Sequence, residues 1–512
     1  KICKMSTFAA FIDFKKAYDT VNRFLLFCKL ESIGISSKML NALKSLYHKV
    51  QSCVKVNGNL TQWFDVQCGL KQGCVLSPIL FNIFINNLVN EVKSLNVGIP
   101  IEEEKICILL YADDIVLLAE NESDLQMLLN VLHMWCHKND ISVNMSKSKI
   151  IHFRPPSFPR SISTFMLGND NIEIVIQYTY LGLHLTEFLN YDLMAKAIAK
   201  SASRALGLLI AKCKSNGGFC YSTYTKLFDT LVWSVIDYGA SIWGTREFSC
   251  INAVKNRAMR FFMGVGKYTP NLSLYGDMGW IPCNVKQWTA VFRLWSRFCK
   301  MDNDRLNKRV FMWSYKYGNK PIKNWCFRVM TKFKEYNLEP YCNCDILLTK
   351  NVIKDIECLA IDLYKTEWHN KLVSNEYAKL RTYKLFKTEF KVENYICKTI
   401  AGKYRSAFAK FRCGVAPLKI ETGRYQNLPI NERICFSCND TIEDEKHVIL
   451  KCPLYADFRA VLFSHANSFC HDFNSMSDDD KFVFLVSDEN VYFYTAKICY
   501  DILLKRKCLL YS

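Results

Sequence analysis

The sequence has no long uncharged apolar run. None of its segments reaches the roughly 18 apolar residues that a membrane span requires, and the longest runs, such as residues 231–236, have the length of core segments. Residues 1–5 (KICKM) carry neither the apolar segment nor the cleavage site of a secretory signal. We therefore expect neither a membrane protein nor a secreted one, but a chain that works in the nucleus and cytoplasm. Because the sequence begins with lysine, we interpret it as a piece of a longer reading frame.

Acidic residues are also scarce. Aspartate and glutamate number 48 against 67 lysines and arginines, which gives a net charge of +19. Such an excess is typical of proteins that bind nucleic acid, because each neutralised phosphate releases counterions. Anionic lipid and a basic surface without a ligand are the alternatives. Half of the residues are hydrophobic and 14% are aromatic, so the chain can bury sizeable cores, in roughly three domains for its length.

The cysteines lack the setting of a disulfide framework. There are 24 of them, scattered along the chain without a secretory signal, which favours reduced thiols and metal binding by any clustered ones. One cluster lies near the C-terminus and consists of Cys435, Cys438, His447 and Cys452. Four soft ligands this close in sequence fit a tetrahedral structural Zn²⁺ site. The alternative is a chance grouping in a cysteine-rich chain.

Strand and helix signals alternate up to residue 189. Asn57 and Gly58 form a strong two-residue hairpin signal, and Pro78 stands in the first turn of an amphipathic segment, where its missing N–H costs nothing. This alternation predicts a sheet covered by helices. The expected elements are strands over 8–13, 106–111 and 115–119, helices over 17–31, 37–49, 78–93 and 122–139, and a hairpin that joins 52–56 to 63–66.

Long helices with basic faces are expected beyond residue 189, over 191–214, 221–238 and 252–265. Residues 300–425 are rich in lysine and aromatic residues and mostly helical in pattern. The tail holds a helix that ends in Lys505, Arg506 and Lys507. There is no internal repeat and no low-complexity run, and the prolines over 155–159 mark a short linker-like break.

Three aspartates stand beside apolar strands. Asp13 ends the first expected strand, and Asp113 and Asp114 lie in the turn between the two others. Adjacent acids next to a core need a counter-charge, because unpaired buried charge is costly. Oxygen ligands suit Mg²⁺, and two such ions roughly 4 Å apart can activate a hydroxyl and neutralise a leaving pyrophosphate. The alternative is an exposed turn in which the acids have no role.

Five motifs in a fixed order give these aspartates a context. They are FIDFKKAYD at 11–19, GLKQGCVLSPILFN at 69–82, YADD at 111–114, NMSKSK at 144–149 and YLG at 180–182. The series resembles that of non-LTR (LINE-type, jockey-like) retrotransposon reverse transcriptases over about residues 8–185, and more loosely beyond. The resemblance implies an α+β fold: a right-hand polymerase palm with an antiparallel sheet and helices, then a helical thumb and a small C-terminal zinc-binding module.

The resemblance also implies metal ligands and a leaving-group lysine. Asp13, Asp113 and Asp114 match the residues that bind two Mg²⁺ ions, with Asp113 the surer ligand of the adjacent pair. Lys147 matches a lysine that protonates or stabilises the departing pyrophosphate, although Lys149 lies close by.

Further residues match positions that contact substrates. The Phe14 carbonyl faces a metal, and Tyr18 matches the aromatic that excludes a ribose 2′-hydroxyl; ordinary packing is its alternative. Gln72 and Gly73 match a pair that contacts template and nucleotide, since glycine permits close backbone approach. Tyr180, Leu181 and Gly182 match a turn that grips the primer. We assign Asp19 and Asp65 no catalytic role; Asp19 is expected to cap or pair locally, near Lys15 and Lys16.

The basic helices after residue 190 take the place of the thumb. Their basic residues, on one face, suit the phosphates of a template–primer duplex, and a solvated face is the alternative. Trp233, Tyr238, Trp243 and Trp280 are expected in the core. The basic residues are Lys196, Lys200, Arg204, Lys212 and Lys214.

The resemblance divides the chain into five parts. These are a palm at 1–189, a thumb-like region at 190–300, a helical linker region at 301–425, the zinc-binding module at 426–465 and a helical tail at 466–512. Nothing resembles the endonuclease or a ribonuclease H, and the fingers segment before Asp13 is mostly missing. The zinc-binding module binds nucleic acid or orients the C-terminal lobe.

Two functions of different classes fit these features. The first is an RNA-directed DNA polymerase for target-primed reverse transcription, with an RNA template, a DNA primer or target and deoxynucleoside triphosphates. The second is an inactive truncated copy that acts only as a nucleic-acid-binding protein. An intron-encoded maturase is a weaker alternative, because the C-terminal cysteine–histidine cluster counts against it.

Overall fold

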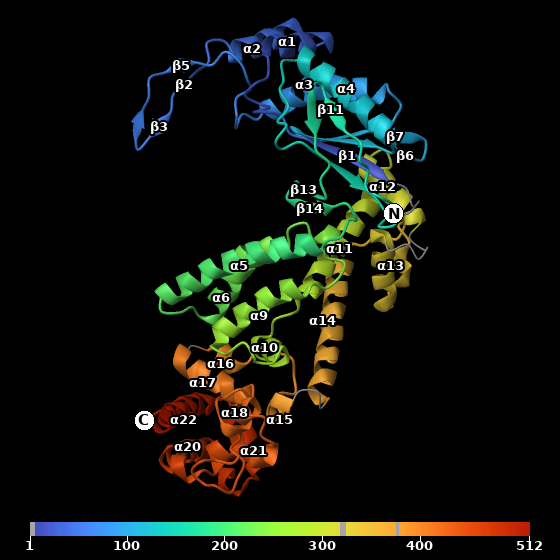
Figure 1. The fold of residues 1–512 in the computed structure, drawn as a ribbon. Coiled ribbons are helices and arrows are strands. Elements are labelled where there is room, and N and C mark those ends of the chain that lie inside the picture. Colours follow the sequence, from blue (N-terminus) through green and yellow to red (C-terminus); the bar gives the residue numbers. More distant parts are fainter. Residues whose placement is uncertain (1–5, 318–323, 375–377, 399, 512) are drawn as a thin grey trace. The chain divides into compact units, whose positions relative to one another are not determined.

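A computed structural model describes residues 6–317, 324–374, 378–398 and 400–511 (Figure 1). The chain divides into two compact units. The first contains residues 1–194 and 301–328, and the second contains residues 195–300 and 329–512. No helix within the described ranges combines the length and the apolar character needed to cross a membrane.

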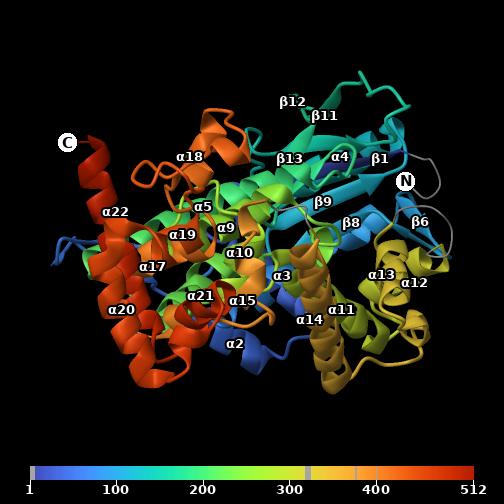
Figure 2. The same cartoon turned by 90° about the horizontal axis from the view of Figure 1, so that it is seen from below.

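A four-stranded antiparallel sheet forms the centre of the first unit. Its order is β10-β1-β9-β8, so β1 pairs with both β9 and β10. Figure 2 shows β1, β8 and β9 side by side. The strands are β1 (Thr7–Ile12), β8 (Ile108–Tyr111), β9 (Asp114–Ala119) and β10 (Lys149–Phe153). The strands predicted over 8–13, 106–111 and 115–119 are therefore confirmed, with ends shifted by one or two residues.

Two helices cover one face of this sheet. α3 (Ser77–Lys93) and α4 (Glu122–Lys138) bury apolar residues against that face, among them Phe84, Leu128 and Trp135. Full burial of such a side chain stabilises the fold by about 1.5–3 kcal/mol. Asn121 caps α4 by accepting a hydrogen bond from the Asp124 N–H, which satisfies one of the free N–H groups at the helix start. The predicted helices over 78–93 and 122–139 are thus confirmed.

The helix predicted over 17–31 begins later than expected. α1 spans Arg23–Ser32, and the side chain of Asn22 caps it by accepting from the Leu25 N–H. Ahead of this cap, Lys16 adopts a φ of 49° and its carbonyl accepts hydrogen bonds from the N–H groups of Asp19 and Thr20. A left-handed residue breaks a helix, so residues 15–19 form a turn. The next helix, α2 (Ser37–Leu46), agrees with its prediction apart from a shorter C-terminal end.

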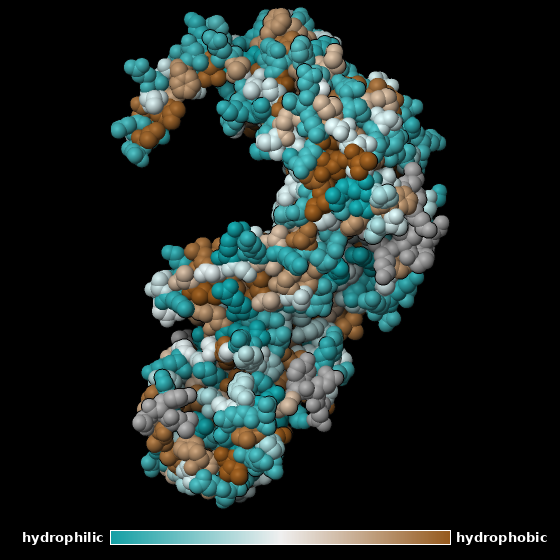
Figure 3. All heavy atoms as spheres, in the orientation of Figure 1, coloured by the Kyte–Doolittle hydropathy of each residue, from teal (hydrophilic) through white to brown (hydrophobic). Residues whose placement is uncertain are grey.

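The hairpin around Asn57 and Gly58 consists of two short ladders, whereas the sequence predicts continuous strands over 52–56 and 63–66. Both turn residues have positive φ, as a type I′ turn requires. The paired segments are β2 (Gln51–Ser52) with β5 (Phe64–Asp65) and β3 (Lys55–Val56) with β4 (Asn59–Leu60). Figure 3 shows brown, hydrophobic spheres along this hairpin at its upper left. Val56, Leu60 and Trp63 are among the exposed residues of the hairpin.

A second hairpin packs against the other face of the sheet. β13 (Gln177–Tyr180) and β14 (Leu183–Thr186) join through Leu181 and Gly182, which both have positive φ. The rings of Tyr178 and Tyr180 lie 4.6 and 5.3 Å from the Phe11 ring. The smaller pairs of the unit are β6 (Ile99–Ile101) with β7 (Glu104–Ile106), and β11 (Phe165–Leu167) with β12 (Asp170–Ile172).

The proline-rich segment over 155–159 is tied to this hairpin at both of its ends. Glu187, next after β14, accepts hydrogen bonds from Arg154 at 3.1 Å and from both Nε and Nη2 of Arg160 at 3.0 Å. The Arg154 N–H also donates to the Glu187 carbonyl. A bidentate arginine–carboxylate pair fixes geometry as well as charge. The predicted linker-like break is therefore an anchored loop.

The second unit is helical. The helix predicted over 191–214 is confirmed as α5, and the one over 252–265 as α9 with both ends two or three residues earlier. The helix predicted over 221–238 is interrupted, because residues 228–233 form a π-helical turn between α6 and α7. The main helices are α5 (Asp192–Ser215), α6 (Tyr221–Leu227), α7 (Ser234–Ile236), α9 (Ser249–Met263), α10 (Asn271–Met278), α11 (Cys283–Lys300), α14 (Lys350–Val373), α17 (Gly402–Arg412), α18 (Lys419–Tyr425), α19 (Glu445–Leu450), α20 (Ala456–Phe469), α21 (Asp478–Ser487) and α22 (Tyr492–Tyr511).

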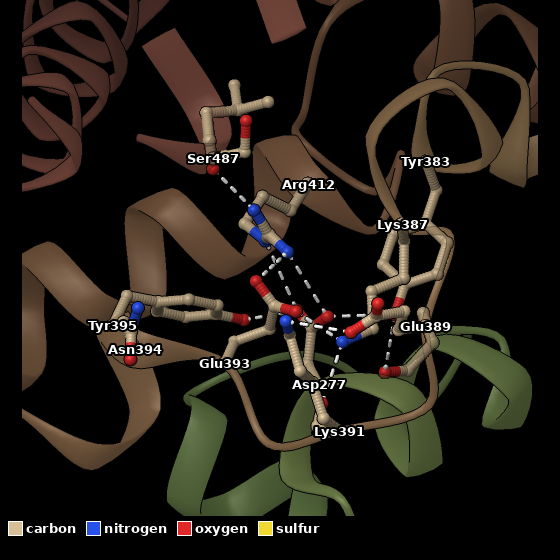
Figure 4. Close-up of polar contacts among 12 residues, drawn as sticks. Asp277, Tyr383, Lys387, Glu389, Lys391, Glu393, Asn394, Tyr395, Arg412 and Ser487 are labelled. Atoms are coloured by element: carbon tan, nitrogen blue, oxygen red, sulfur yellow. Dashed lines mark hydrogen bonds and ion pairs between the residues drawn. The ribbon is translucent and has the colours of Figure 1, made fainter. Parts of the chain in front are cut away.

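A buried charge cluster ties the elements of the second unit together (Figure 4). Asp277 on α10 is fully buried and accepts hydrogen bonds from the hydroxyls of Tyr383 at 2.8 Å and Tyr395 at 2.5 Å. Arg412 on α17 is 1% exposed and pairs with Asp277 at 3.4 Å and with Glu393 at 2.7 Å. Every member of the cluster has a partner, which is the condition for burying charge without a large penalty.

We expect Asp277→Ala to destabilise the second unit by about 3–5 kcal/mol, because it leaves the Arg412 charge buried without its full set of partners. Urea denaturation followed by far-UV circular dichroism measures this. Asp362→Ala is the matched control: Asp362 pairs with Lys365 at the surface at 2.9 Å, and loss of such a pair costs less than about 1 kcal/mol. Equal effects of the two substitutions would contradict the role of the buried cluster.

Candidate functional site

The ends of two neighbouring strands bring three carboxylates together. β1 and β9 are antiparallel with Ile12 opposite Ile115, so Asp13 follows β1 at the same edge where Asp114 begins β9. Asp113 occupies the turn before β9, in which Ala112 has a φ of 54°. Burial, and then the charges of Asp113 and Asp13, raise the pKa of Asp114. Mutual repulsion of this kind is typical of a site that binds cations.

The segment at 144–149 surrounds Asp13. The Asn144 side chain donates to the Asp13 carboxylate at 2.9 Å, and the Asp13 N–H donates to the Ser148 hydroxyl at 3.1 Å. Lys147 extends its ammonium to 3.7 Å from the same carboxylate, while Lys149 pairs with Glu173 at 2.9 Å. Of the two lysines that the sequence leaves open, Lys147 is the one beside the carboxylates.

Tyr18 and Phe14 flank the carboxylates with different exposures. The ring of Tyr18 stacks on Phe81 at 4.6 Å and is half-buried. Burial, and then the charge of Asp113, raise the pKa of its phenol. Phe14 is buried, with its ring centroid 6.2 Å from that of Trp135. Tyr18 therefore combines packing with an approach to the site, whereas the Phe14 side chain serves the core.

Gln72 and Gly73 lie on an exposed loop that Asp19 contacts. The Gln72 amide donates to the Asp19 carboxylate at 2.8 Å. Gly73 has a φ of 80°, and a Cβ added there would meet no atom within 4 Å, so the surface beside it is open. The local cap or pairing expected for Asp19 is a wrong prediction, because its partner lies 53 residues further along the chain. A carboxamide contributed by a distant loop leaves no signal in the local sequence.

The turn of Tyr180, Leu181 and Gly182 follows β13, and the two tyrosines of β13 lie near the carboxylates. Burial, and then the charge of Asp114, raise the pKa of Tyr180. Burial, and then the charges of Asp13 and Asp114, also raise the pKa of Tyr178. None of the five sequence motifs contains Tyr178. Its signal is the two-residue spacing from Tyr180, which places both side chains on one face of a strand.

The predicted zinc ligands meet in the second unit. The candidate ligand atoms of Cys435, Cys438, His447 and Cys452 all lie within 4.8 Å of one another. Nε2 of His447 lies 3.5 Å from the Cys438 sulfur, and its Nδ1 lies 3.2 Å from the Thr441 hydroxyl. A polar partner on the second ring nitrogen orients a ligand histidine. Burial raises the pKa of the Cys452 thiol to about 12 and lowers the pKa of His447.

Two buried glutamates anchor this Cys–His cluster to the rest of the unit. Glu443 accepts from the Lys419 N–H at 2.6 Å and pairs with Arg506 of α22. Glu445 pairs with Arg381 at 2.6 Å through both carboxylate oxygens. Both glutamates are fully buried, so these ion pairs fix the position of α19 and its histidine.

The expected basic face of α5 is present in part. Lys196, Lys200 and Arg204 are exposed at four-residue spacing, which places them on one face. Leu208, four residues after Arg204, and Leu193, three residues before Lys196, are also exposed, so the strip mixes basic and apolar residues. Lys212 and Lys214 are exposed at its C-terminal end. Among the four aromatics expected in the core, Trp243 and Trp280 are buried and Trp233 is half-buried, but Tyr238 is 52% exposed, contrary to expectation.

The chain is similar to proteins of mobile elements. Residues 1–185 match the family described as reverse transcriptase (RNA-dependent DNA polymerase). The Pol polyprotein of retrotransposable element R2 from Popillia japonica is 25% identical over 70% of this chain and 59% of that protein. The RNA-directed DNA polymerase of mobile element jockey from Drosophila funebris is 22% identical over 48% of this chain and 27% of that protein. This chain therefore spans only part of each relative's length.

One solved structure overlaps a large part of the chain. Telomerase from Candida albicans, in complex with a fragment of telomeric RNA, covers 60% of this chain and 49% of its own at 13% identity. Its TM-score of 0.27 is too low to bear on the fold.

An antiparallel sheet with acidic residues at the ends of neighbouring strands, and helices on one face, defines the palm of a right-hand polymerase. The proteins that resemble this chain in sequence indicate which kind of polymerase it is. Residues 1–185 match the reverse transcriptase family, and the proteins that resemble the chain in sequence include those of R2 and jockey elements.

The crowded carboxylates lead to a stability prediction. Because the folded-state pKa of Asp114 is raised, the protonated form fits the fold better, and its stabilising contribution is lost as pH rises through that pKa. At pH 7 and without divalent ions, Asp114→Asn should therefore raise the Tm by about 1–2 °C. The rise is small because the repulsion at this solvated position lowers the free energy of unfolding by less than about 1 kcal/mol. Differential scanning fluorimetry measures this, with Asp65→Asn as the control. A lowered Tm for Asp114→Asn would contradict the repulsion.

Proposed function

We propose that the chain is the polymerase part of an RNA-directed DNA polymerase of a non-LTR retrotransposon, and that it extends a DNA primer along an RNA template by target-primed reverse transcription. The observation that carries the proposal is the meeting of Asp13, Asp113 and Asp114 at one sheet edge, inside a reverse transcriptase domain. The net charge of +19 agrees with polyanionic partners. Its substrates are an RNA template, a DNA primer or target, and deoxynucleoside triphosphates.

The three carboxylates fit a divalent-metal site. All three offer oxygen atoms, and a cation would offset the repulsion among them, which together with burial raises the pKa of Asp114. Asp13 and Asp113 would hold two Mg²⁺ ions with the Phe14 carbonyl, and Asp114 supports the shell. Bound there, the ions would lower the pKa of the primer 3′-hydroxyl and neutralise the charge that develops on the pyrophosphate.

The remaining residues position the reactants. Lys147, 68% exposed and 3.7 Å from Asp13, is placed to donate a proton or a positive charge to the departing pyrophosphate. Tyr18, with its ring fixed against Phe81, lies under the sugar of the incoming nucleotide and leaves no room for a 2′-hydroxyl. Gln72 and Gly73 contact the nucleotide and template. Tyr180, Leu181 and Gly182 hold the primer end.

The Cys–His cluster fits structural Zn²⁺. Three sulfurs and one imidazole nitrogen form a closed donor set for this ion, and the buried glutamates Glu443 and Glu445 tie the segment between its ligands to the rest of the unit. Of the two roles that the sequence leaves open, these anchors favour orientation of the C-terminal lobe over direct contact with nucleic acid. The lysines and arginine of α5 lie along the phosphates of the template–primer duplex.

Primer extension on an RNA template, with Mg²⁺ and deoxynucleotides, tests the polymerase. We expect Asp113→Asn to lower the rate by at least about 10³-fold, because it removes a metal ligand, while salt-sensitive RNA binding stays within about twofold. In the same assay Lys147→Ala should slow synthesis and Lys149→Ala, its matched control, should not. Near-normal synthesis by Asp113→Asn would refute the metal site. RNA binding without any synthesis by the unaltered chain would instead identify an inactive copy that only binds nucleic acid.

Metal analysis and thermal unfolding test the zinc site. We expect one zinc ion per chain, and its removal by a chelator should lower the Tm of the second unit strongly, because binding of a structural Zn²⁺ is coupled to folding. Cys438→Ser should have the same effect, whereas the exposed Cys397, outside the cluster, serves as the control in Cys397→Ser. A Cys438→Ser protein with full zinc content would overturn the ligand assignment.

A further inference from the structure

Two motifs of the palm are joined by main-chain hydrogen bonds. The Leu70 N–H donates to the Tyr18 carbonyl at 2.7 Å, and the Gly69 N–H donates to the Val21 carbonyl at 2.9 Å. Residues 66–73, which we call the glutamine loop, therefore run directly against the turn that follows β1. The glutamine loop carries Gln72, and the turn carries Tyr18.

Arg23 also holds the glutamine loop against the segment that follows β1. Its guanidinium donates to three carbonyls of the glutamine loop, those of Val66 at 2.7 Å, Cys68 at 3.0 Å and Gly69 at 2.9 Å. It also lies 5.1 Å from the ring centre of Tyr47. A planar donor with five N–H groups suits such a cluster of acceptors. The start of the glutamine loop is therefore held by one side chain in addition to the backbone.

Gly69 allows this close approach. A Cβ at Gly69 would lie 2.5 Å from the Asp19 carbonyl oxygen, and its φ is 84°. Only glycine satisfies both conditions without strain. The backbone of Asp19 and that of the glutamine loop are therefore in direct contact.

At the tip of the glutamine loop the Ser77 hydroxyl donates to the Lys71 carbonyl at 2.6 Å, and the Gln72 amide donates to the Asp19 carboxylate at 2.8 Å. Hydrogen bonds to a charged acceptor are stronger than neutral ones. Both residues are solvent-exposed, so packing contributes little to the position of the Gln72 side chain. Asp19 follows Tyr18 directly, and the bond therefore fixes Gln72 relative to Tyr18.

We propose that Asp19 is a positioning residue of the polymerase: its carboxylate holds the Gln72 amide at a set distance from Tyr18, so that both side chains meet the incoming nucleotide together. This inference rests on the proposed function, since it assigns Tyr18 and Gln72 to the nucleotide. Without the carboxylate, Gln72 samples several rotamers, and the nucleotide must order its side chain on binding. The entropy lost in this ordering weakens nucleotide binding and leaves the rate of the chemical step largely unchanged.

Steady-state primer extension with Asp19→Ala and Asp19→Asn tests the inference. We expect Asp19→Ala to raise the KM for deoxynucleotides about three- to tenfold with kcat changed less than about twofold. Asp19→Asn keeps an acceptor oxygen for the Gln72 amide and should restore most of the affinity. Asp65→Ala is the matched control, because Asp65 accepts an equivalent bond from Gln51 at 2.9 Å, on the hairpin.

A double-mutant cycle decides whether Asp19 acts through Gln72. Asp19→Ala should have no further effect in a Gln72→Ala background, since the interaction is already lost. Additive effects would overturn the inference and assign Asp19 a separate role, as would an unchanged KM in Asp19→Ala.

Hydrogen exchange separates this inference from the proposed function. In Asp19→Ala, amides over residues 71–74 should exchange faster than in Asp65→Ala, while those of Gly69 and Leu70 stay protected by their main-chain bonds. If the unaltered chain synthesises no DNA, the proposed function fails, and the exchange result alone shows whether Asp19 holds Gln72. Equal exchange of these amides in the two variants would show that Asp19 does not hold Gln72 in place.

Discussion

The antiparallel pairing of β1 with β9 and β10 is the constraint on which the palm depends. Because Ile12 lies opposite Ile115 and Phe11 opposite Lys149, the residues just beyond these pairs are brought to one edge of the sheet. They include the aspartates and the segment around Lys147. Repulsion among the acids opposes this arrangement, and the burial of apolar residues under α3 and α4 offsets it. Strand pairing and apolar burial together thus set the geometry of the site.

The sequence predicts those parts of the fold whose causes are local. The apolar runs of β1 and β9, the Asn57–Gly58 turn and the capped start of α4 each have a pattern within a few residues. The helix expected from residue 17 starts only at Arg23, because the turn before it is held by hydrogen bonds from residues 69 and 70. A pattern of neighbours in sequence cannot reveal bonds of that range.

In the candidate site too, some residues follow from a local sequence pattern and others depend on distant partners. Asp13, Asp113 and Asp114 follow from short motifs beside apolar strands, whereas the choice of Lys147 over Lys149 depends on Glu173, a partner that no motif contains. Asp277 and Arg412 are isolated charges in the sequence, and only the fold shows that they neutralise each other. Tyr178 was within reach of pattern reasoning, since it alternates with Tyr180 on one strand.

The ion pair between Glu443 and Arg506 makes the last helix a structural part of the Cys–His cluster. Glu443 is fully buried and Arg506 is 5% exposed, so neither charge has water as a substitute partner. A chain that ended before Arg506 would keep all four candidate metal ligands and still leave a carboxylate stranded beside them. Arg506 of α22 is thus remote in sequence from the candidate metal ligands. It nevertheless determines whether the protein around those ligands can fold with its buried charges paired.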